Sequence, residues 1–513
     1  MFSDIKKILS KGEYNTLKIF LLLNVLMFFL ETLSILSIPL FVSSIINTND
    51  VLEKINLINL FLNFQISGSS LIKYVSFIVI LLFFLKNLSI LLLNFYQGKF
   101  IEKVKINVSN SLYGHYLTMP YINHLEKDPS TLTRNIIVST QGLYAFMNHI
   151  MNLTRESVAI LVILLLLIFT SPLISIFLII FFSILIFTYL KVIKPKIKSK
   201  SNFNNELRKK TTQLIFESFN SIKDLKVLMK ERFIFDFFKN NISIFEKNLF
   251  YFQFNEKLPK IFLELSSIIF VSLVALLFFS FTDNYTDYLA QISLIIICVF
   301  RFIPAFNGVA VSSVYLKISR PDLDNLKIEL EEIKDLKNKS YLNITKNNSS
   351  SNNKKYEKDF VSVSNLNFTY KNKDLTIKDL DLRIKRGEIL GITGDSGAGK
   401  STFFYMMLGL IVPIGGNIYS YGKNIFADLE TWRKKTAYVS QNSFLLDGTI
   451  RKNIAFDYTE NEKISENKII SVLKTAEFYT QVLTYSKGLE TQVGHGGIKL
   501  SGGEKQRISI SRA

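Results

Sequence analysis

The stretch "GDSGAGKST", from Gly394 to Thr402, has the residue types and the spacing for phosphate chemistry. It fits the pattern G-x-x-x-x-G-K-[ST], with an apolar run "EILGIT" before it and the helical run "STFFYMMLGL" after it. In such a loop, glycines let backbone amides close around phosphate oxygens, Lys400 can reach the β and γ phosphates, and the Ser401 hydroxyl can ligate magnesium. The alternative, a glycine-rich turn that matches by accident, is disfavoured by the flanking strand and helix. The predicted phosphate site comprises Gly394, Asp395, Ser396, Gly397, Ala398, Gly399, Lys400, Ser401 and Thr402.

A second stretch, "LSGGEKQRISISRA" from Leu500 to Ala513, places a serine and two glycines at the start of a basic helix. The first amides of a helix have no partner within the helix, so they can bind a phosphate group. The sequence alone leaves open which phosphate that is.

The composition places part of the chain in lipid. The 513 residues are 48% hydrophobic and include 45 phenylalanines, which leaves room for two or three domains. The net charge of +19 could suit nucleic acid or an anionic membrane. However, lysine far outnumbers arginine, as AT-rich coding produces, and no nucleic-acid motif accompanies the charge. We therefore expect no nucleic-acid partner. The lone cysteine, Cys298, can form no intrachain disulfide, and nothing suggests a metal site built from cysteine.

Hydropathy predicts six membrane spans, each near the length of about 20 residues that crosses a bilayer. They run from Leu17 to Ile46, Leu71 to Phe95, Leu143 to Thr170, Leu173 to Ile193, Ile261 to Phe281 and Tyr288 to Val309. Residues 1–16 before them have an amphipathic pattern, which predicts a helix lying along the membrane surface. Residues 17–320 are thus predicted to form an all-α, six-span transmembrane domain.

The positions of the cations predict the orientation. Between Lys191 and Lys260 there are sixteen Lys and Arg but seven Asp and Glu, whereas "TDNYTDY" between the last two spans has no cation. The positive-inside rule then places both termini in the cytosol of a multi-pass protein, and we expect a bacterial inner membrane. The intervening segments 97–147 and 194–260 are predicted to be helices that continue beyond the bilayer.

The composition of the sequence changes after the last predicted span. Residues 321–358 predict a charged helix followed by a polar, flexible linker. Residues 359–513 contain short β-rich runs such as "FVSVSNLNFTY" and "TIKDLDLRI", the phosphate loop and the basic helix. They predict an α/β P-loop domain.

Taken together, these motifs resemble the nucleotide-binding domain of an ABC transporter, and the whole chain resembles a half-size ABC exporter. The resemblance implies bound ATP and Mg²⁺. Tyr370 in "NFTY" matches the aromatic residue that stacks on adenine, and Gln441 in "AYVSQ" matches the glutamine that contacts magnesium together with Ser401.

In this family, the signature "LSGGEKQR" closes over the ATP held by a second domain. The partner site would therefore include Leu500, Ser501, Gly502, Gly503 and Glu504. Because the chain carries one nucleotide domain and six spans, we expect it to pair with a second copy or with a paralogous half-transporter.

The resemblance also implies residues that do not occur. The magnesium-binding aspartate, the catalytic glutamate and the histidine near the γ-phosphate are missing after the signature, and all four histidines precede it. "VGHGG" around His495 departs from the family pattern too. We therefore expect a C-terminally truncated domain with no catalytic residue present, exposed apolar surface, and little hydrolysis by this chain alone.

Two loop segments give the best clue to the substrate. The runs "YLTMPYINHLEKDPSTLTRNI" and "SIKDLKVLMKERFIFDFF" resemble those of exporters that flip lipid-linked oligosaccharides and related polysaccharide precursors. Within them, Met119 to Lys127 and Lys230 to Phe238 match the family's coupling helices. The alternatives are a peptide, drug or lipid exporter, and an ATP-binding membrane protein that does not hydrolyse ATP.

Three cations, Lys86, Lys260 and Arg301, lie in or at the predicted spans. A cation in mid-bilayer costs about 2.5 to 3.5 kcal/mol on insertion scales, so it usually faces a cavity, a partner charge or water. We predict that the three line a substrate cavity and attract the pyrophosphate of a lipid-linked substrate. Internal pairing is the alternative, with Glu264 for Lys260 and Glu31 for one of the others.

Overall fold

The computed structural model describes residues 2–46, 68–170, 194–281, 286–338, 359–370, 377–441, 443–456 and 464–513, and isolated positions between 171 and 193. The chain forms two compact units. The first comprises Met1–Met119 and Asn123–Asn338, and the second comprises Pro120–Ile122 and Lys339–Ala513. This division separates the predicted membrane domain from the predicted nucleotide domain.

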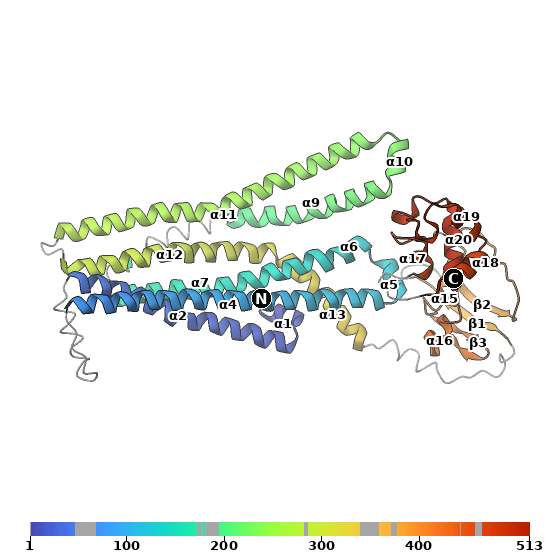
Figure 1. The fold of residues 1–513 in the computed structure, drawn as a ribbon, viewed down its shortest axis with the longest axis horizontal. Coiled ribbons are helices and arrows are strands. Elements are labelled where there is room, and N and C mark those ends of the chain that lie inside the picture. The colour runs from blue at the N-terminus through green and yellow to red at the C-terminus, as the bar shows by residue number, and fades with distance from the viewer. Residues whose placement is uncertain are drawn as a thin grey trace. The chain divides into compact units, whose positions relative to one another are not determined.

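The first unit is all helical (Figure 1). Long helices alternate with short ones, as the predicted spans and their extensions require. The elements are α1 (Phe2–Ile8), α2 (Lys11–Ile46), α4 (Gly68–Thr118), α5 (Tyr121–Glu126), α6 (Pro129–Arg134), η1 (Asn135–Ser139), α7 (Thr140–Thr170), α9 (Lys194–Asn220), α10 (Ile222–Val227), α11 (Glu231–Phe281), α12 (Thr286–Ile318) and α13 (Arg320–Asn338).

Four helices in the described part of the chain are long and apolar enough to cross a membrane: 11–46, 70–118, 129–170 and 291–318. They contain the first, second and third predicted spans and most of the sixth. The fifth predicted span forms the end of the 51-residue α11. The fourth, Leu173 to Ile193, lies outside the described residues. Helices α4 and α11 continue far past the predicted spans, and α9 covers residues 194–220, which confirms that the described intervening segments are largely helical.

Apolar packing between α7, α11 and α12 forms the core of the spanning region. Ile163 and Leu167 of α7 are buried against Cys298 and Phe302 of α12. Away from that core, much of the apolar surface of the long helices is exposed, for example Phe77 and Ile80 of α4. An apolar outer surface suits a bundle surrounded by lipid rather than water.

Helix α1 differs from its prediction. Instead of presenting its apolar face to lipid, it buries Ile5, Ile8 and Leu9 in a core shared with Leu323 and Leu326 of α13. Its polar face is paired as well, because Lys7 contacts Glu331 at 2.8 Å and Asp4 contacts Arg320 at 2.8 Å. The amphipathic pattern was identified correctly, but the apolar partner of that face is a protein helix, which the pattern alone cannot distinguish from lipid.

The second unit contains a four-stranded antiparallel sheet in the order β2-β1-β3-β4. Its strands are β1 (Val361–Phe368), β2 (Ile377–Ile384), β3 (Gly415–Ser420) and β4 (Lys423–Asn424). The predicted strands "FVSVSNLNFTY" and "TIKDLDLRI" are confirmed as β1 and β2, which pair with Val361 opposite Ile384. The apolar face of β1 packs on α15 (Lys400–Met407), where Phe403 and Met406 are buried.

Smaller elements complete the second unit. They are η3 (Ile425–Ala427), α16 (Leu429–Arg433), α17 (Ile450–Ala455), α18 (Glu466–Thr475), α19 (Tyr479–Thr484), η4 (Gly488–Glu490), η5 (His495–Gly497) and α20 (Gly502–Arg512). Residues from α17, α18, α19 and α20 share a second apolar core around Ile450, Leu473 and Ile508. This core supports the start of α20, the predicted basic helix.

The apolar run "EILGIT", residues 388–393, is not a strand, contrary to its prediction. A strand needs a neighbour to complete its hydrogen-bond ladder, and among the described residues none pairs with this run. Ile389 is 97% exposed and Leu390 40% exposed. Tyr438 and Val439, in the segment 437–441 that has no regular secondary structure, are exposed too. Apolar side chains of both segments are therefore exposed in this domain.

Candidate nucleotide site and membrane charges

The phosphate loop joins the extended run 388–393 to helix α15. Gly397 and Gly399 have φ values of +89° and +85°, a left-handed conformation that favours glycine. Gly399 is the N-cap of α15, and no side chain caps that end of the helix. The first amides of α15 therefore remain available to an anion, as the sequence predicted.

Lys400 lies across its own loop. Its Nζ donates to the carbonyl oxygens of Gly394 at 2.6 Å and Asp395 at 2.8 Å. These are contacts that a phosphate oxygen can replace, because an ammonium group forms a stronger hydrogen bond with an anion than with a neutral carbonyl. The geometry brings the positive charge and the uncapped helix terminus together at one place.

The predicted adenine-binding residue, Tyr370, lies beside the loop. Its hydroxyl is 3.1 Å from the Thr402 Oγ1, and its ring packs edge-on against Phe368 at 5.0 Å. Thr402 is buried, whereas Ser401 is exposed. The structure thus joins Tyr370 to the phosphate loop and leaves the Ser401 hydroxyl accessible.

The residues present fit a nucleotide phosphate with magnesium. Ser401 can offer its hydroxyl to the ion, and Gln441 is exposed at the end of the 437–441 segment. The described residues contain no group of three or more His, Cys, Asp or Glu side chains that could hold a metal. Magnesium here would therefore take its ligands from Ser401, Gln441 and the phosphate oxygens. Bound ATP supplies the free energy of its hydrolysis.

The signature segment forms the capped start of α20. Ser501 is the N-cap, and its hydroxyl accepts from the Glu504 amide at 3.3 Å, while Glu504 Oε2 accepts from the Ser501 amide at 2.6 Å. Leu500 is buried and anchors the turn. A Cβ added at Gly502 or Gly503 would meet nothing within 4 Å, so packing inside this chain does not explain either glycine. Close approach by a group from outside the chain would explain both.

Two residues that the sequence analysis missed position Glu504. The Tyr485 hydroxyl donates to Glu504 Oε1 at 2.6 Å, and the Gln481 amide donates to the same oxygen. The hydrogen bond from Tyr485 foremost, together with those to Ser501, holds the pKa of Glu504 below its ordinary value. Burial and the Glu504 carboxylate raise the pKa of Tyr485 to about 12. Ser501 and Glu504 have the S-x-x-E spacing of a capping box, but no local pattern links Tyr485 to a residue 19 positions later.

The first predicted coupling segment contributes to the second unit. Tyr121 and Ile122 pack in the core around β1 and α15. The ring of Tyr121 lies 5.2 Å from that of Tyr405, edge to face. The second predicted segment, Lys230 to Phe238, forms the start of α11, and its predicted docking stays untested.

Arg301 is paired inside the helical bundle. Its guanidinium contacts Glu31 of α2 and also Glu156 of α7, the latter at 3.5 Å. Glu156 further accepts from Arg155 at 3.1 Å. A side chain charged in mid-bilayer is stabilised by such partners. For Arg301, the internal ion pair is therefore the interpretation that the structure favours.

The other two predicted cavity cations are less engaged. Lys86 is half-buried, with its Nζ 5.2 Å from the centre of the Phe83 ring. Lys260 is exposed, and in the described part of the chain no ion pair joins it to Glu264. The structure does not bring Lys260 together with Arg301, and the substrate role of the three cations stays a prediction.

The first unit thus contains helices of membrane-spanning length, and the second contains an uncapped phosphate loop and a capped signature helix. The family model for the ABC transporter transmembrane region matches residues 21–304, more than half of the chain, and the ABC transporter model matches residues 377–513. The chain belongs to the ABC transporter family.

Curated relatives match 30% of the chain. The ABC transporter ATP-binding protein y4gM of Sinorhizobium fredii is 34% identical over 154 residues, which are 30% of this chain and 26% of that protein. The multidrug resistance-like ATP-binding protein MdlA of Buchnera aphidicola is 35% identical over 154 residues, again 26% of its length. The human mitochondrial iron-sulfur clusters transporter ABCB7 is 34% identical over 154 residues, 20% of its length. The match thus spans about a quarter or less of these relatives.

A solved structure extends the likeness to the whole chain. The bacterial Atm1-family ABC exporter with ATP bound superposes with a TM-score of 0.65 over 97% of this chain and 83% of that one, at 16% identity. Similarity at that identity shows a shared exporter fold. It supports the fold prediction of a helical transmembrane domain followed by a nucleotide-binding domain.

Proposed function

We propose that this chain is one half of an ATP-driven exporter that binds magnesium ATP at Gly394–Thr402, with Tyr370 against the adenine and Gln441 near the ion. The observation that carries the proposal is the meeting of Lys400 with the uncapped start of α15. Both groups attract the same anion, and neither has another anionic partner in the described residues. Hydrolysis of that ATP would drive transport.

A second nucleotide domain would complete the site. The exposed Ser501, Gly502 and Gly503 would approach the ATP held by a second copy of the chain or by a paralogous half-transporter. The open space at both glycines supports this pairing. In a symmetric dimer, the same contact would occur twice.

The substrate we favour is an amphipathic, lipid-linked glycan moved across a bacterial inner membrane, with both termini in the cytosol. The loop segments that resemble those of lipid-linked oligosaccharide flippases support this choice. The names of two relatives point instead to drugs and to iron-sulfur clusters. A peptide, drug or lipid exporter is therefore the second candidate, and a membrane protein that binds ATP without hydrolysis is a third.

ATP binding is tested by Lys400→Ala in the purified chain. We expect the affinity for magnesium ATP, measured by titration calorimetry, to fall at least tenfold, because the loop loses its only lysine charge. Lys435→Ala is the matched control, since Lys435 is an exposed lysine of the same domain. Wild-type affinity in the Lys400 variant would remove the basis of the assignment.

The substrate is tested in proteoliposomes of the chain with the family's C-terminal catalytic segment restored, using a fluorescent pyrophosphate-linked lipid glycan and, separately, a hydrophobic drug. We expect ATP-dependent movement of the glycan only. Lys86→Gln and Lys260→Gln should reduce it without lowering basal ATP binding. Arg301→Gln should lower the unfolding temperature, because it removes the cation that pairs with Glu31 and leaves Glu156 with Arg155 alone. Movement of the drug alone would select the second candidate, and ATP binding without movement of either compound would select the third.

A further inference from the structure

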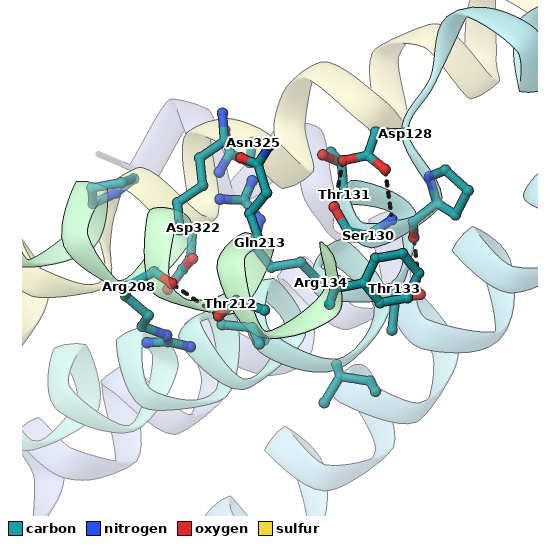
Figure 2. Close-up of a pocket in the computed structure, with 16 residues that line it drawn as sticks. Asp128, Ser130, Thr131, Thr133, Arg134, Arg208, Thr212, Gln213, Asp322 and Asn325 are labelled. Atoms are coloured by element: carbon teal, nitrogen blue, oxygen red, sulfur yellow. Dashed lines mark hydrogen bonds between the residues drawn. The ribbon is translucent and has the colours of Figure 1, made fainter. Parts of the chain in front are cut away.

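A cavity of about 340 Å³ lies within the first unit, between the α6–η1 segment and helices α9 and α13 (Figure 2). Arg134 lines it from α6, Arg208 from α9, and Asp322 with Asn325 from α13. The phosphate loop belongs to the other unit, so this cavity is not part of the nucleotide site. Its volume is near the lower end of sites that bind small organic molecules.

The cavity carries more cations than free carboxylates. Arg134, Arg208 and Lys209 contribute three positive charges. Of the two carboxylates, Asp128 is already used as the N-cap of α6, where it accepts from the Ser130 amide at 3.2 Å and from the Ser130 hydroxyl. Over the residues that the structure describes, neither arginine forms an ion pair within 4 Å. Guanidinium groups of this kind match phosphate or carboxylate, which they can bind through two parallel hydrogen bonds.

The second carboxylate, Asp322, is held in place by tight helix packing. A Cβ at Gly142 of α7 would lie 2.4 Å from the Asp322 Cβ and 2.5 Å from its Oδ2, so glycine is needed for this approach. Burial raises the pKa of Asp322, while the charges of Arg208 and Arg134 act against that shift. The positive charges of both arginines therefore act on the carboxylate, although in the described residues it forms no ion pair with either. The carboxylate remains available to a cation.

The helix that forms one wall is irregular. Residues Asn135–Ser139 form a π-helical turn between α6 and α7. Ile137 and Val138 of this turn line the cavity and add an apolar side to it. Single π-helical turns are rare and occur often at functional sites.

We propose that this cavity binds a small zwitterion, with its phosphate or carboxylate group on Arg134 and Arg208 and its ammonium group on Asp322. Two guanidinium groups and one carboxylate around one cavity complement opposite charges on the same ligand. The ligand is either a free molecule or the headgroup of a phospholipid, since both offer this chemistry.

The test uses the full chain in phosphatidylcholine nanodiscs, with O-phosphoethanolamine and inorganic phosphate as probes in titration calorimetry. We expect Arg134→Gln and Arg208→Gln to weaken both probes at least tenfold. Asp322→Asn should weaken phosphoethanolamine at least tenfold and leave phosphate binding equal or stronger, because a repelling carboxylate is removed. Arg232→Gln, an exposed arginine that does not line the cavity, should change neither affinity.

The opposite results overturn the proposal. They are no binding of phosphoethanolamine by the wild type, wild-type affinities in both arginine variants, or equal losses of both probes in Asp322→Asn. Should an arginine variant fail to fold, protection of the wild-type Arg134 and Arg208 from phenylglyoxal by phosphoethanolamine gives the answer, and absence of protection contradicts us. Competition by phosphatidylethanolamine in the nanodisc identifies a lipid headgroup, and no competition identifies a free ligand.

Discussion

Glu504 shows how single side chains define the signature turn. Its carboxylate caps the amide of Ser501 and accepts from Tyr485 and Gln481. Four polar groups from two helices thus fix one turn whose glycines have no packing role inside this chain. The rigidity of that turn depends on the ionised carboxylate, which makes it sensitive to acid.

The first residue-scale prediction concerns this acid sensitivity. The pKa of Glu504 is lowered chiefly by the hydrogen bond from Tyr485. A lowered pKa contributes stability above the ordinary value of 4.5, and that stability is lost as the pH falls through the folded-state pKa. We expect amide protection factors at Glu504 to stay constant from about pH 8 to 5 and to fall only in stronger acid.

Tyr485→Phe should raise the pH at which this protection is lost. The variant removes the main group that stabilises the ionised carboxylate, at about 0.5 to 1.5 kcal/mol for one hydrogen bond. Protection factors, which correct for the intrinsic pH dependence of exchange, are the measurement. Tyr479→Phe is the control, because Tyr479 makes no contact with Glu504 in the structure. Identical pH profiles for wild type and Tyr485→Phe would contradict the assignment.

At the scale of residues, patterns of neighbouring residues predicted only those features that neighbouring residues form. The phosphate loop is written in consecutive residues, so its glycines and its lysine were predicted from their spacing, and the serine and glycines at the start of the basic helix were noted in the same way. Tyr485, Arg134, Arg208 and Asp322 were missed because tertiary packing brings them together from separate helices. The partner of Arg301 was left open for the same reason, and the structure supplies both Glu31 and Glu156.

Among the elements, α1 and α13 are joined by both apolar and charged contacts. Ile5 is fully buried, and Lys7 pairs with Glu331. Helix α13 follows the last spanning helix, so α1 braces the segment between the bundle and the rest of the chain. Its docking should therefore determine how stable α13 is.

We predict that Ile5→Asn releases α1 and increases hydrogen exchange in Leu323–Ile333 at least tenfold. The substitution places an amide in a site that is 0% exposed and removes its apolar contacts. Lys6→Asn is the matched control, because Lys6 is the exposed neighbour on the same helix. If α1 lay on lipid instead, exchange in α13 would be the same in both variants.

Helices and strands were predicted best where their apolar face packs against another part of the same unit. The helices and the strands β1 and β2 follow their periodicity because each has a packing partner in its own unit. The run 388–393 has the composition of a strand but joins no hydrogen-bond ladder in the described residues. Composition gives only a preference for strand structure, and pairing with a neighbouring strand decides whether the strand forms.

For the whole molecule, pairing is the testable consequence of the open signature turn. We expect Ser501→Cys in one copy and Ser396→Cys in another to form an intermolecular disulfide when magnesium ATP is present, because the two turns would then face the same phosphate. The native Cys298 is buried and should not compete. Non-reducing gels read the result, with Ser465→Cys replacing Ser501→Cys as the control. Equal cross-linking without nucleotide, or none with it, would contradict the pairing.

The exposed run around Ile389 also affects how the protein behaves in concentrated solution. An exposed apolar segment that belongs to no strand ladder among the described residues is a template for another extended chain. Tyr438 and Val439 add to the same hazard. Two molecules can thus also associate through the segment that leads into the phosphate loop. Self-association would then involve the segment that leads into the phosphate loop. Any loss of solubility should therefore be accompanied by loss of nucleotide binding.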